Sequence, residues 1–82
     1  MTVKIRYFAG AAEAAGVHEE TLDADFEVTV ADLVEQLGAD RERLATVLAA
    51  CTLLVDGQAV RARTEYVPAG AQVDVLPPFA GG

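Results

Sequence analysis

One apolar helix face near the middle of the chain limits the folds that are open to it. Four apolar residues recur at the spacing of a single helix face, namely Val30, Leu33, Val34 and Leu37. Thr29 and Asp32 resemble a capping box at the start of this segment, and Gly38 offers a stop at its end. Because such a helix must bury its apolar face against another element, the remaining residues have to supply an apolar surface.

Alternating residue types predict that this surface is a sheet. From Val3 to Ala9, every second residue up to Tyr7 is apolar, whereas two charged residues occupy the other face. A weaker alternating run covers Glu19 to Phe26, after a short helical or turn segment between Gly10 and Gly16. These patterns predict two strands joined by a moderately long connection.

The second half of the chain predicts three more strands. Thr52 to Val55 forms one, Asp56-Gly57 is a hairpin turn signal, and a short return strand follows around Ala59 to Arg61. Pro68-Ala69-Gly70 is another turn, after which alternation up to Leu76 predicts the last strand.

A second helix is expected between the central helix and the third strand. Asp40 is its expected cap, and three apolar residues line one side of it, Leu44, Val47 and Leu48. The order strand, strand, helix, strand, strand, strand places one main amphipathic helix across a small mixed sheet. This is the α+β arrangement of the β-grasp, or ubiquitin-like, fold, whose first and last strands lie parallel at the sheet centre. With 82 residues, the chain has room for one such domain over residues 1–76 and an extended tail over residues 77–82.

Composition excludes several classes of function. The formal net charge is −7 and the six Lys and Arg residues are scattered, which argues against nucleic-acid binding and favours a partner with a basic surface. No stretch approaches the ~18 apolar residues of a membrane span, and the first strand begins too early for a signal peptide. We therefore expect a cytoplasmic protein that does not contact a membrane.

Single residues that could carry chemistry have simpler interpretations. Cys51 lies among small and apolar residues, so we expect a buried side chain and no catalytic thiol or internal disulfide. His18 has no companion at metal-ligand spacing, so we predict a solvated loop residue and no metal site. The sequence holds no convincing nucleophile–base pair or phosphate-binding loop. Four glutamates are expected to be solvated surface charges, Glu13, Glu19, Glu20 and Glu27.

The chain ends in a di-glycine behind two prolines. Proline favours a stiff extended segment, whereas Gly81 and Gly82 let an enzyme close around the last residues without meeting a Cβ atom. From Leu76 to Gly82 this tail could span roughly 20 Å, enough to enter a pocket of a neighbouring protein. We interpret the α-carboxylate of Gly82 as the reactive group. The tail residues expected to contact a partner are Pro77, Pro78, Phe79 and Ala80.

Two large apolar residues break the strand patterns. Phe8 has the parity of the charged residues in the first strand, and Leu76 has the parity of Asp74 in the last one. If the two strands are neighbours, Phe8 and Leu76 meet at the root of the tail and form a docking surface. We assign Val60 to the same surface, although parity alone does not separate it from Ala59. The alternative is that both are isolated exposed side chains or are covered by a loop.

Four segments resemble a known family over essentially the whole chain. They are Val3-Lys4-Ile5-Arg6-Tyr7-Phe8-Ala9, Thr29-Val30-Ala31-Asp32-Leu33, Val55-Asp56-Gly57 and Leu76-Pro77-Pro78-Phe79-Ala80-Gly81-Gly82. Together they look like the small subunit of molybdopterin synthase, in the MoaD and ThiS group of ubiquitin-like sulfur carriers. Phe79 departs from the smaller aliphatic residue that the family more often has there.

This resemblance implies a two-stage use of the terminus. A ubiquitin-activating-type adenylyltransferase, using ATP and Mg²⁺, would adenylate the Gly82 carboxylate, and a sulfur donor protein would convert the adenylate to a thiocarboxylate. The tail would then enter a basic pocket of the large synthase subunit and donate sulfur to a cyclic pyranopterin precursor in molybdenum cofactor biosynthesis. The chain itself would bind no cofactor, have no activity alone and join a heterotetramer of two large and two small subunits.

Three other functions stay open at this point. The thiocarboxylate could serve another pathway, such as thiamine, cysteine or tRNA thiolation. Gly82 could instead be joined to lysines of target proteins, as in a ubiquitin-like modifier. The chain could also be an adaptor that uses the surface around Phe8 and Leu76 while its tail stays inert.

Overall fold

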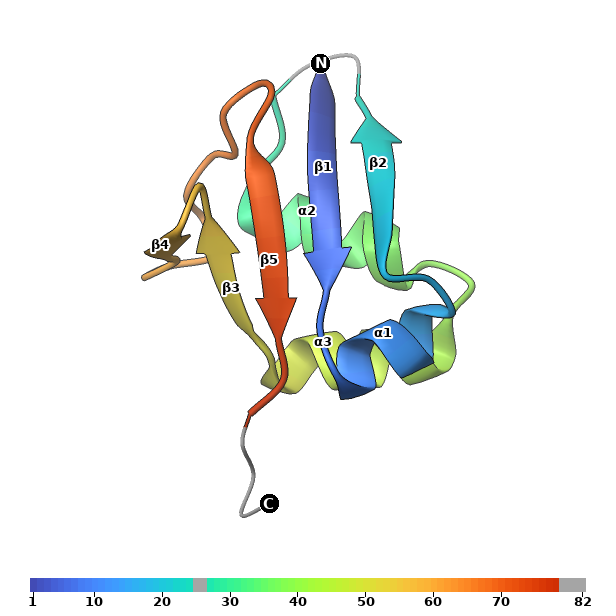
Figure 1. Ribbon diagram of the computed structural model, residues 1–82. Helices are drawn as coiled ribbons and strands as arrows, with labels where there is room; N and C mark the ends of the chain where they lie inside the picture. The colour runs from blue at the N-terminus through green and yellow to red at the C-terminus, as the bar shows by residue number, and fades with distance from the viewer. Residues whose placement is uncertain (25–26, 79–82) are drawn as a thin grey trace.

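A mixed sheet of five strands with helices packed on one face makes up the fold (Figure 1). The computed structural model describes residues 1–24 and 27–78. In chain order the elements are β1 Thr2–Tyr7, α1 Gly10–Ala15, β2 Glu19–Asp23, α2 Val30–Gly38, α3 Glu42–Ala50, β3 Thr52–Val55, β4 Gln58–Ala59 and β5 Gln72–Leu76.

The first and last strands lie parallel in the middle of the sheet. The strand order is β2-β1-β5-β3-β4, and the register of the parallel pair places Ile5 beside Val73 and Tyr7 beside Val75. The other three pairings, β1 with β2, β3 with β5 and β3 with β4, are antiparallel. This topology confirms the predicted β-grasp fold.

Local sequence signals define the start of α2 as predicted. The side-chain oxygen of Thr29 accepts a hydrogen bond from the backbone N–H of Asp32 at 3.1 Å, and the Asp32 carboxylate accepts one from the Thr29 N–H at 3.3 Å. This reciprocal capping box satisfies two N–H groups that a helix start leaves without a partner. The apolar face of α2 that follows buries Val30, Leu33 and Leu37.

The β3–β4 hairpin also forms where its turn signal predicts. Asp56 and Gly57 have φ values of 49° and 83°, the left-handed pair that a tight two-residue hairpin needs. Because this turn pairs Val55 directly with Gln58, the return strand is β4 at Gln58–Ala59 and ends before Arg61.

The predicted strand ends and the predicted helix cap need correction. β1 stops at Tyr7 because Ala9, with φ of 48°, turns the chain into α1. β2 stops at Asp23, and the predicted end at Phe26 lies outside the described residues. Asp40 does not cap α3: it has φ of 60° in the turn, and the capping position is held by Arg41, which makes no side-chain cap.

Gly38 is the last residue of α2. Glycine is required there because of a contact with another helix, which the sequence pattern does not predict. The chain leaves the helix in an extended conformation at Ala39, so Gly38 is not a left-handed stop. A Cβ atom at position 38 would lie 2.9 Å from the Cβ of Ala45 in α3. Glycine is therefore needed for the close approach of α3 to the end of α2.

The core lies between the helices and one face of the sheet. Its largest fully buried side chains are Ile5, Leu33, Leu37, Leu44, Leu48, Val3, Val30, Val67, Val73 and Val75. The opposite sheet face carries no helix, and we call it the open face (Figure 1). Within residues 1–24 and 27–78, no helix has both the length and the apolar character to cross a bilayer.

Replacing Gly38 by alanine should destabilise the fold, since the new methyl group must displace Ala45 from its contact with α2. We expect a loss of about 1–3 kcal/mol in the free energy of unfolding, measured by denaturant titration. Gly10→Ala is the matched control, because a Cβ atom at Gly10 meets nothing within 4 Å. Equal losses in both variants would contradict this account of Gly38.

Candidate functional site

The described part of the tail leaves the sheet at the end of its central strand. β5 ends at Leu76, which pairs with Thr52 at the start of β3, and the half-buried Pro77 and exposed Pro78 follow. The terminal residues assigned to chemistry and docking, Phe79, Ala80, Gly81 and Gly82, lie outside the described residues. The structure therefore describes where the tail leaves the sheet, and the chemical role of Gly82 stays a prediction.

Phe8 and Leu76 lie next to each other on the open face at this tail root. Tyr7 pairs with Val75, and the Phe8 N–H donates to the Val75 carbonyl at 3.2 Å, so the register continues to Phe8 beside Leu76. Phe8 is 38% exposed and Leu76 is half-buried. The two parity exceptions are thus brought together, and their role in docking stays a prediction.

Two further residues extend this apolar surface across the sheet. Leu54 pairs with Asp74 on one side and with Ala59 on the other, so its side chain shares the open face. We define the open-face patch as Phe8, Leu54, Ala59 and Leu76. Sequence reasoning missed Leu54 because Leu53 and Leu54 are both apolar, and only the strand register shows which of them faces the core.

The assignment of Val60 to this surface is wrong. Its N–H donates to the carbonyl of Leu53 at 3.0 Å, which continues the β3–β4 register and puts Val60 opposite a core residue. Val60 is half-buried and packs against the core cluster. Because neighbouring residues in a strand point to opposite faces, Ala59 is the one that belongs to the open-face patch.

An ion pair on β1 and β5 borders the open-face patch. The Arg6 guanidinium donates from Nε to Asp74 Oδ1 at 2.9 Å and from Nη2 to Asp74 Oδ2 at 3.3 Å. The same guanidinium carbon lies 5.5 Å from the centre of the Phe8 ring. The hydrogen bonds and charge of Asp74 raise the pKa of Arg6. Although the sequence places both residues on one face, their pairing depends on a contact across 68 positions of the chain.

Glu20 is not the solvated charge that the sequence suggests. Its Oε2 accepts hydrogen bonds from the Tyr7 hydroxyl at 2.7 Å and from the Arg41 Nη2 at 3.0 Å. Burial, followed by this hydrogen bond to Glu20, raises the pKa of Tyr7. The network joins β1 and β2 to the start of α3, which indicates a structural role. The other three glutamates are exposed as predicted, Glu13, Glu19 and Glu27.

Cys51 and His18 show no sign of a reactive or metal-binding site. Cys51 is 8% exposed, and burial raises the pKa of its thiol despite the nearby charge of Arg63. A thiol in this state is a poor nucleophile at neutral pH. His18 is exposed. Among the described residues, no three His, Cys, Asp or Glu side chains gather closely enough to hold a metal ion.

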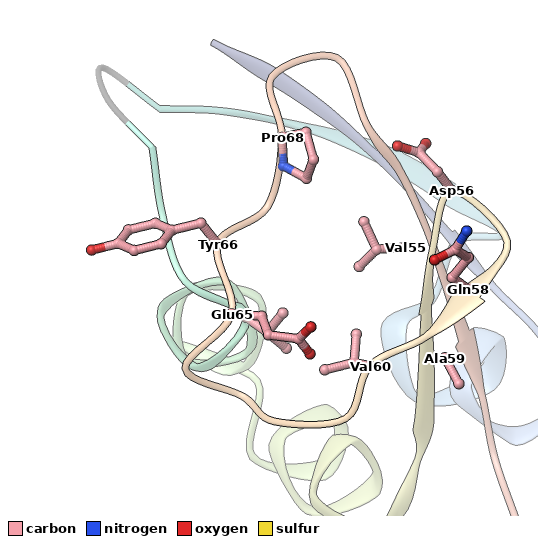
Figure 2. Close-up of a pocket in the computed structure, with 9 residues that line it drawn as sticks. Val55, Asp56, Gln58, Ala59, Val60, Glu65, Tyr66 and Pro68 are labelled. Carbon is pink, nitrogen blue, oxygen red and sulfur yellow. The ribbon is translucent and has the colours of Figure 1, made fainter.

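A separate groove of about 320 Å³ lies between the β3–β4 hairpin and the segment that follows it (Figure 2). Val55 and Val60 line it, and Glu65 extends its carboxylate toward Val60, whereas Tyr66 points outward (Figure 2). β5 begins beside this hairpin and ends at the opposite end of the sheet (Figure 1). The groove is therefore remote from the tail root.

Glu65 holds the segment that closes this groove. Its Oε2 accepts hydrogen bonds from the backbone N–H groups of Arg61 at 2.9 Å and Ala62 at 3.0 Å. These hydrogen bonds, that of Ala62 first, lower the pKa of the Glu65 carboxyl. The carbonyl of the same residue accepts from the Val30 N–H at 2.9 Å, which fixes the segment to the start of α2.

Comparison with known proteins identifies the family. The sequence pattern of the ThiS family matches residues 5–82. The chain belongs to the ThiS family. It is 32% identical over 83 residues to the molybdopterin synthase sulfur carrier subunit of Chlamydomonas reinhardtii, with 100% of both chains covered. The resemblance stated from the sequence is thereby confirmed.

Two solved structures of this ThiS-family fold resemble the chain over nearly its whole length. A putative molybdopterin converting factor subunit 1 of Pyrococcus furiosus has a TM-score of 0.85 and 29% identity, with 96% of this chain and 99% of that chain covered. The protein SAMP1 of Haloferax volcanii has a TM-score of 0.84 and 28% identity, with 100% of both chains covered.

The contribution of Glu65 to stability should depend on pH. Because its pKa is lower in the folded state, the stabilisation is fully present above its unfolded pKa of about 4.3 and is lost as pH falls through the lower folded value. We expect Glu65→Gln to be less stable than the wild type at neutral pH, with a difference that shrinks below that window.

Denaturant titrations of both proteins at neutral and acidic pH measure this difference. Glu35→Gln is the control, since Glu35 is an exposed glutamate on α2. A stability difference for Glu65→Gln that stays constant from neutral to acidic pH would refute the assignment.

Proposed function

We propose that this chain is the sulfur carrier subunit of molybdopterin synthase, and that the carboxylate of Gly82 carries the sulfur as a thiocarboxylate. The observation that supports this most directly is the 32% identity to a subunit of that name, which extends over 100% of both chains. The match to the ThiS family also continues through the di-glycine to residue 82. The region shared with these proteins therefore includes both the folded base and the terminus.

The proposed chemistry needs only a free carboxylate from this chain. In the first step an oxygen of the Gly82 carboxylate attacks the α-phosphorus of ATP, and pyrophosphate leaves. An activating enzyme would hold the ATP and Mg²⁺, where the cation stabilises the developing negative charge. In the second step sulfur at the oxidation level of sulfide, delivered by a donor protein as HS⁻, attacks the acyl carbon; the bond from this carbon to the AMP oxygen breaks, AMP leaves and the thiocarboxylate remains. Glycine at positions 81 and 82 keeps side chains away from both attacks.

The thiocarboxylate would then be delivered by docking to a large synthase subunit. The open-face patch lies at the tail root, so a partner that covers Phe8 and Leu76 also receives the tail. The formal net charge of −7 favours a partner with a basic surface around the tail pocket. We propose an assembly of two large and two small subunits, in which the large subunits act on the cyclic pyranopterin precursor.

A ubiquitin-like modifier is the second candidate function. It is favoured by the likeness to SAMP1, which has a TM-score of 0.84 and 28% identity; a related structure is described as small archaeal modifier protein 1. In that case the activated Gly82 carbonyl would be attacked by a lysine amine instead of a sulfur atom. Both functions use the same activated terminus, so the nucleophile that accepts it distinguishes them.

Intact-mass measurement of the chain purified from its own organism tests the carrier chemistry. We expect a fraction of the protein to be heavier by the mass difference between sulfur and oxygen. This fraction should vanish when Gly82 is deleted or when one bulky residue is added after it. Lysine conjugates of the chain without any sulfur-bearing form would instead support the modifier function.

Replacing Phe8 by aspartate should weaken docking to the large synthase subunit without unfolding the chain. Docking would bury the part of Phe8 that is still exposed, and an aspartate there would leave an unpaired carboxylate under the partner, so we expect the dissociation constant to rise about tenfold or more. Tyr66→Asp is the matched control, because Tyr66 is an aromatic residue with 66% exposure at the remote groove. Calorimetric titration gives both constants, and equal values for the two variants would refute docking through the open-face patch.

A further inference from the structure

Arg6 and Asp74 form an ion pair beside the open-face patch, and the Asp74 side chain is nearly buried there. The Asp74 side chain is 12% exposed and that of Arg6 is 42% exposed, although no helix covers this face of the sheet. Asp74 lies between β1 and β3, beside Arg6 on one side and Leu54 on the other. Its carboxylate is therefore already committed to Arg6, while the outer part of the guanidinium still meets solvent.

Arg6 keeps hydrogen-bonding capacity that this chain does not use. A guanidinium has five N–H donors, and the two bonds to Asp74 leave from Nε and Nη2. Its Nη1 has no hydrogen-bond partner in residues 1–24 and 27–78. The Phe8 ring at 5.5 Å packs beside the same group. Asp74 and Phe8 thus hold the guanidinium in place, with at least two donors directed away from Asp74.

Docking over the patch changes the surroundings of this pair. A partner that covers Phe8 and Leu76 also covers Arg6, because the Arg6 guanidinium lies against the Phe8 ring. An apolar partner surface would take water away from the Nη1 donors, which make no hydrogen bond within the described residues although Glu19 lies opposite Arg6 on β2, and this costs binding free energy. A partner with an oxygen atom at that point would instead gain a charge-assisted hydrogen bond. The Arg6 guanidinium would therefore weaken binding to an apolar partner surface and strengthen binding to a partner that offers an oxygen atom at that point.

We propose that Arg6 is a specificity-determining contact of the docking face and that Asp74 is its positioning residue. The partner presents a carboxylate or carbonyl oxygen to the outer edge of the Arg6 guanidinium. This inference rests on the proposed function, because it takes the large synthase subunit as the protein that covers the open-face patch. It adds to that function one requirement on the partner surface, namely a hydrogen-bond acceptor opposite Arg6.

The test compares three variants in calorimetric titrations against the large synthase subunit of the same organism. The double variant Arg6→Leu/Asp74→Val removes both charges and leaves neither unpaired, so it should fold with wild-type or greater stability. We expect its dissociation constant to rise on the order of tenfold or more, since a charge-assisted hydrogen bond is lost. An unchanged or lower dissociation constant for this variant would overturn the proposal.

Two single variants keep the test decisive if the double variant does not fold. Arg6→Lys retains the charge but loses the planar arrangement of donors, so weaker binding is expected. Asp74→Asn retains one carbonyl oxygen for the guanidinium, so its binding should lie between those of the wild type and Arg6→Lys. Wild-type affinity in Arg6→Lys would overturn the proposal. Melting curves recorded for each variant separate lost contacts from lost structure.

The outcomes also separate this inference from the function on which it rests. If Phe8→Asp weakens binding and the Arg6 variants do not, docking over the patch stands and the role of Arg6 is refuted. If the wild-type chain does not bind the large subunit at all, the proposed function fails and this inference fails with it. Weaker binding in both sets of variants supports both.

Discussion

Backbone hydrogen bonds between β1 and β5 join the two ends of the chain at the centre of the sheet. The Lys4 N–H donates to the Ala71 carbonyl at 3.0 Å, and the Phe8 N–H donates to the Val75 carbonyl at 3.2 Å. A parallel pair needs a long crossover between its strands, and here nearly the whole chain forms it. The tail root, the open-face patch and the Arg6–Asp74 ion pair all follow from this one register. If β5 slipped by one residue against β1, its core-facing and open-face side chains would exchange places. Leu76 would then no longer lie beside Phe8, nor Asp74 beside Arg6.

All three described helices lie on one side of the sheet and leave its other face uncovered (Figure 1). α2 and α3 pack on the face that carries Ile5 and Val75, and Gly38 lets the two helices approach closely. No helix remains to cover the other face (Figure 1). Large exposed apolar patches mark interaction sites or promote association, and here the charged Arg6 and Asp74 lie beside the apolar side chains. The charged pair therefore belongs to the surface that a partner covering this face would contact.

Features determined by neighbours in sequence could be predicted, and features determined by distant contacts could not. The capping box at Thr29 and the Asp56-Gly57 hairpin depend on a few adjacent residues, and both form as expected. Alternation likewise identified the core face of β1. Whether Ala59 or Val60 lies on the open face depends on the β3–β4 register, which cannot be predicted from alternation within a single strand.

Charged and small residues show the same limit. Glu20 looks like a surface charge in the sequence, yet Tyr7 and Arg41 approach it from 13 and 21 positions away. Gly38 looks like a helix stop, yet its neighbour is Ala45 in the next helix. In each case the physical reason is a contact made only after the elements pack. Predictions from local pattern therefore gave the elements and the topology but missed the pairings that distinguish one surface from another.

The division between tail and folded domain has a consequence for recognition. A di-glycine terminus has almost no side chains through which a partner could recognise one carrier among several. A putative molybdopterin converting factor subunit 1 and a small archaeal modifier protein 1 share this fold with TM-scores of 0.85 and 0.82, so the backbone does not separate them either. Selection among partners must then come from side chains on the surface beside the tail. On the described part of that surface, the Arg6–Asp74 pair is one such group, and the Arg6 side chain is still 42% exposed.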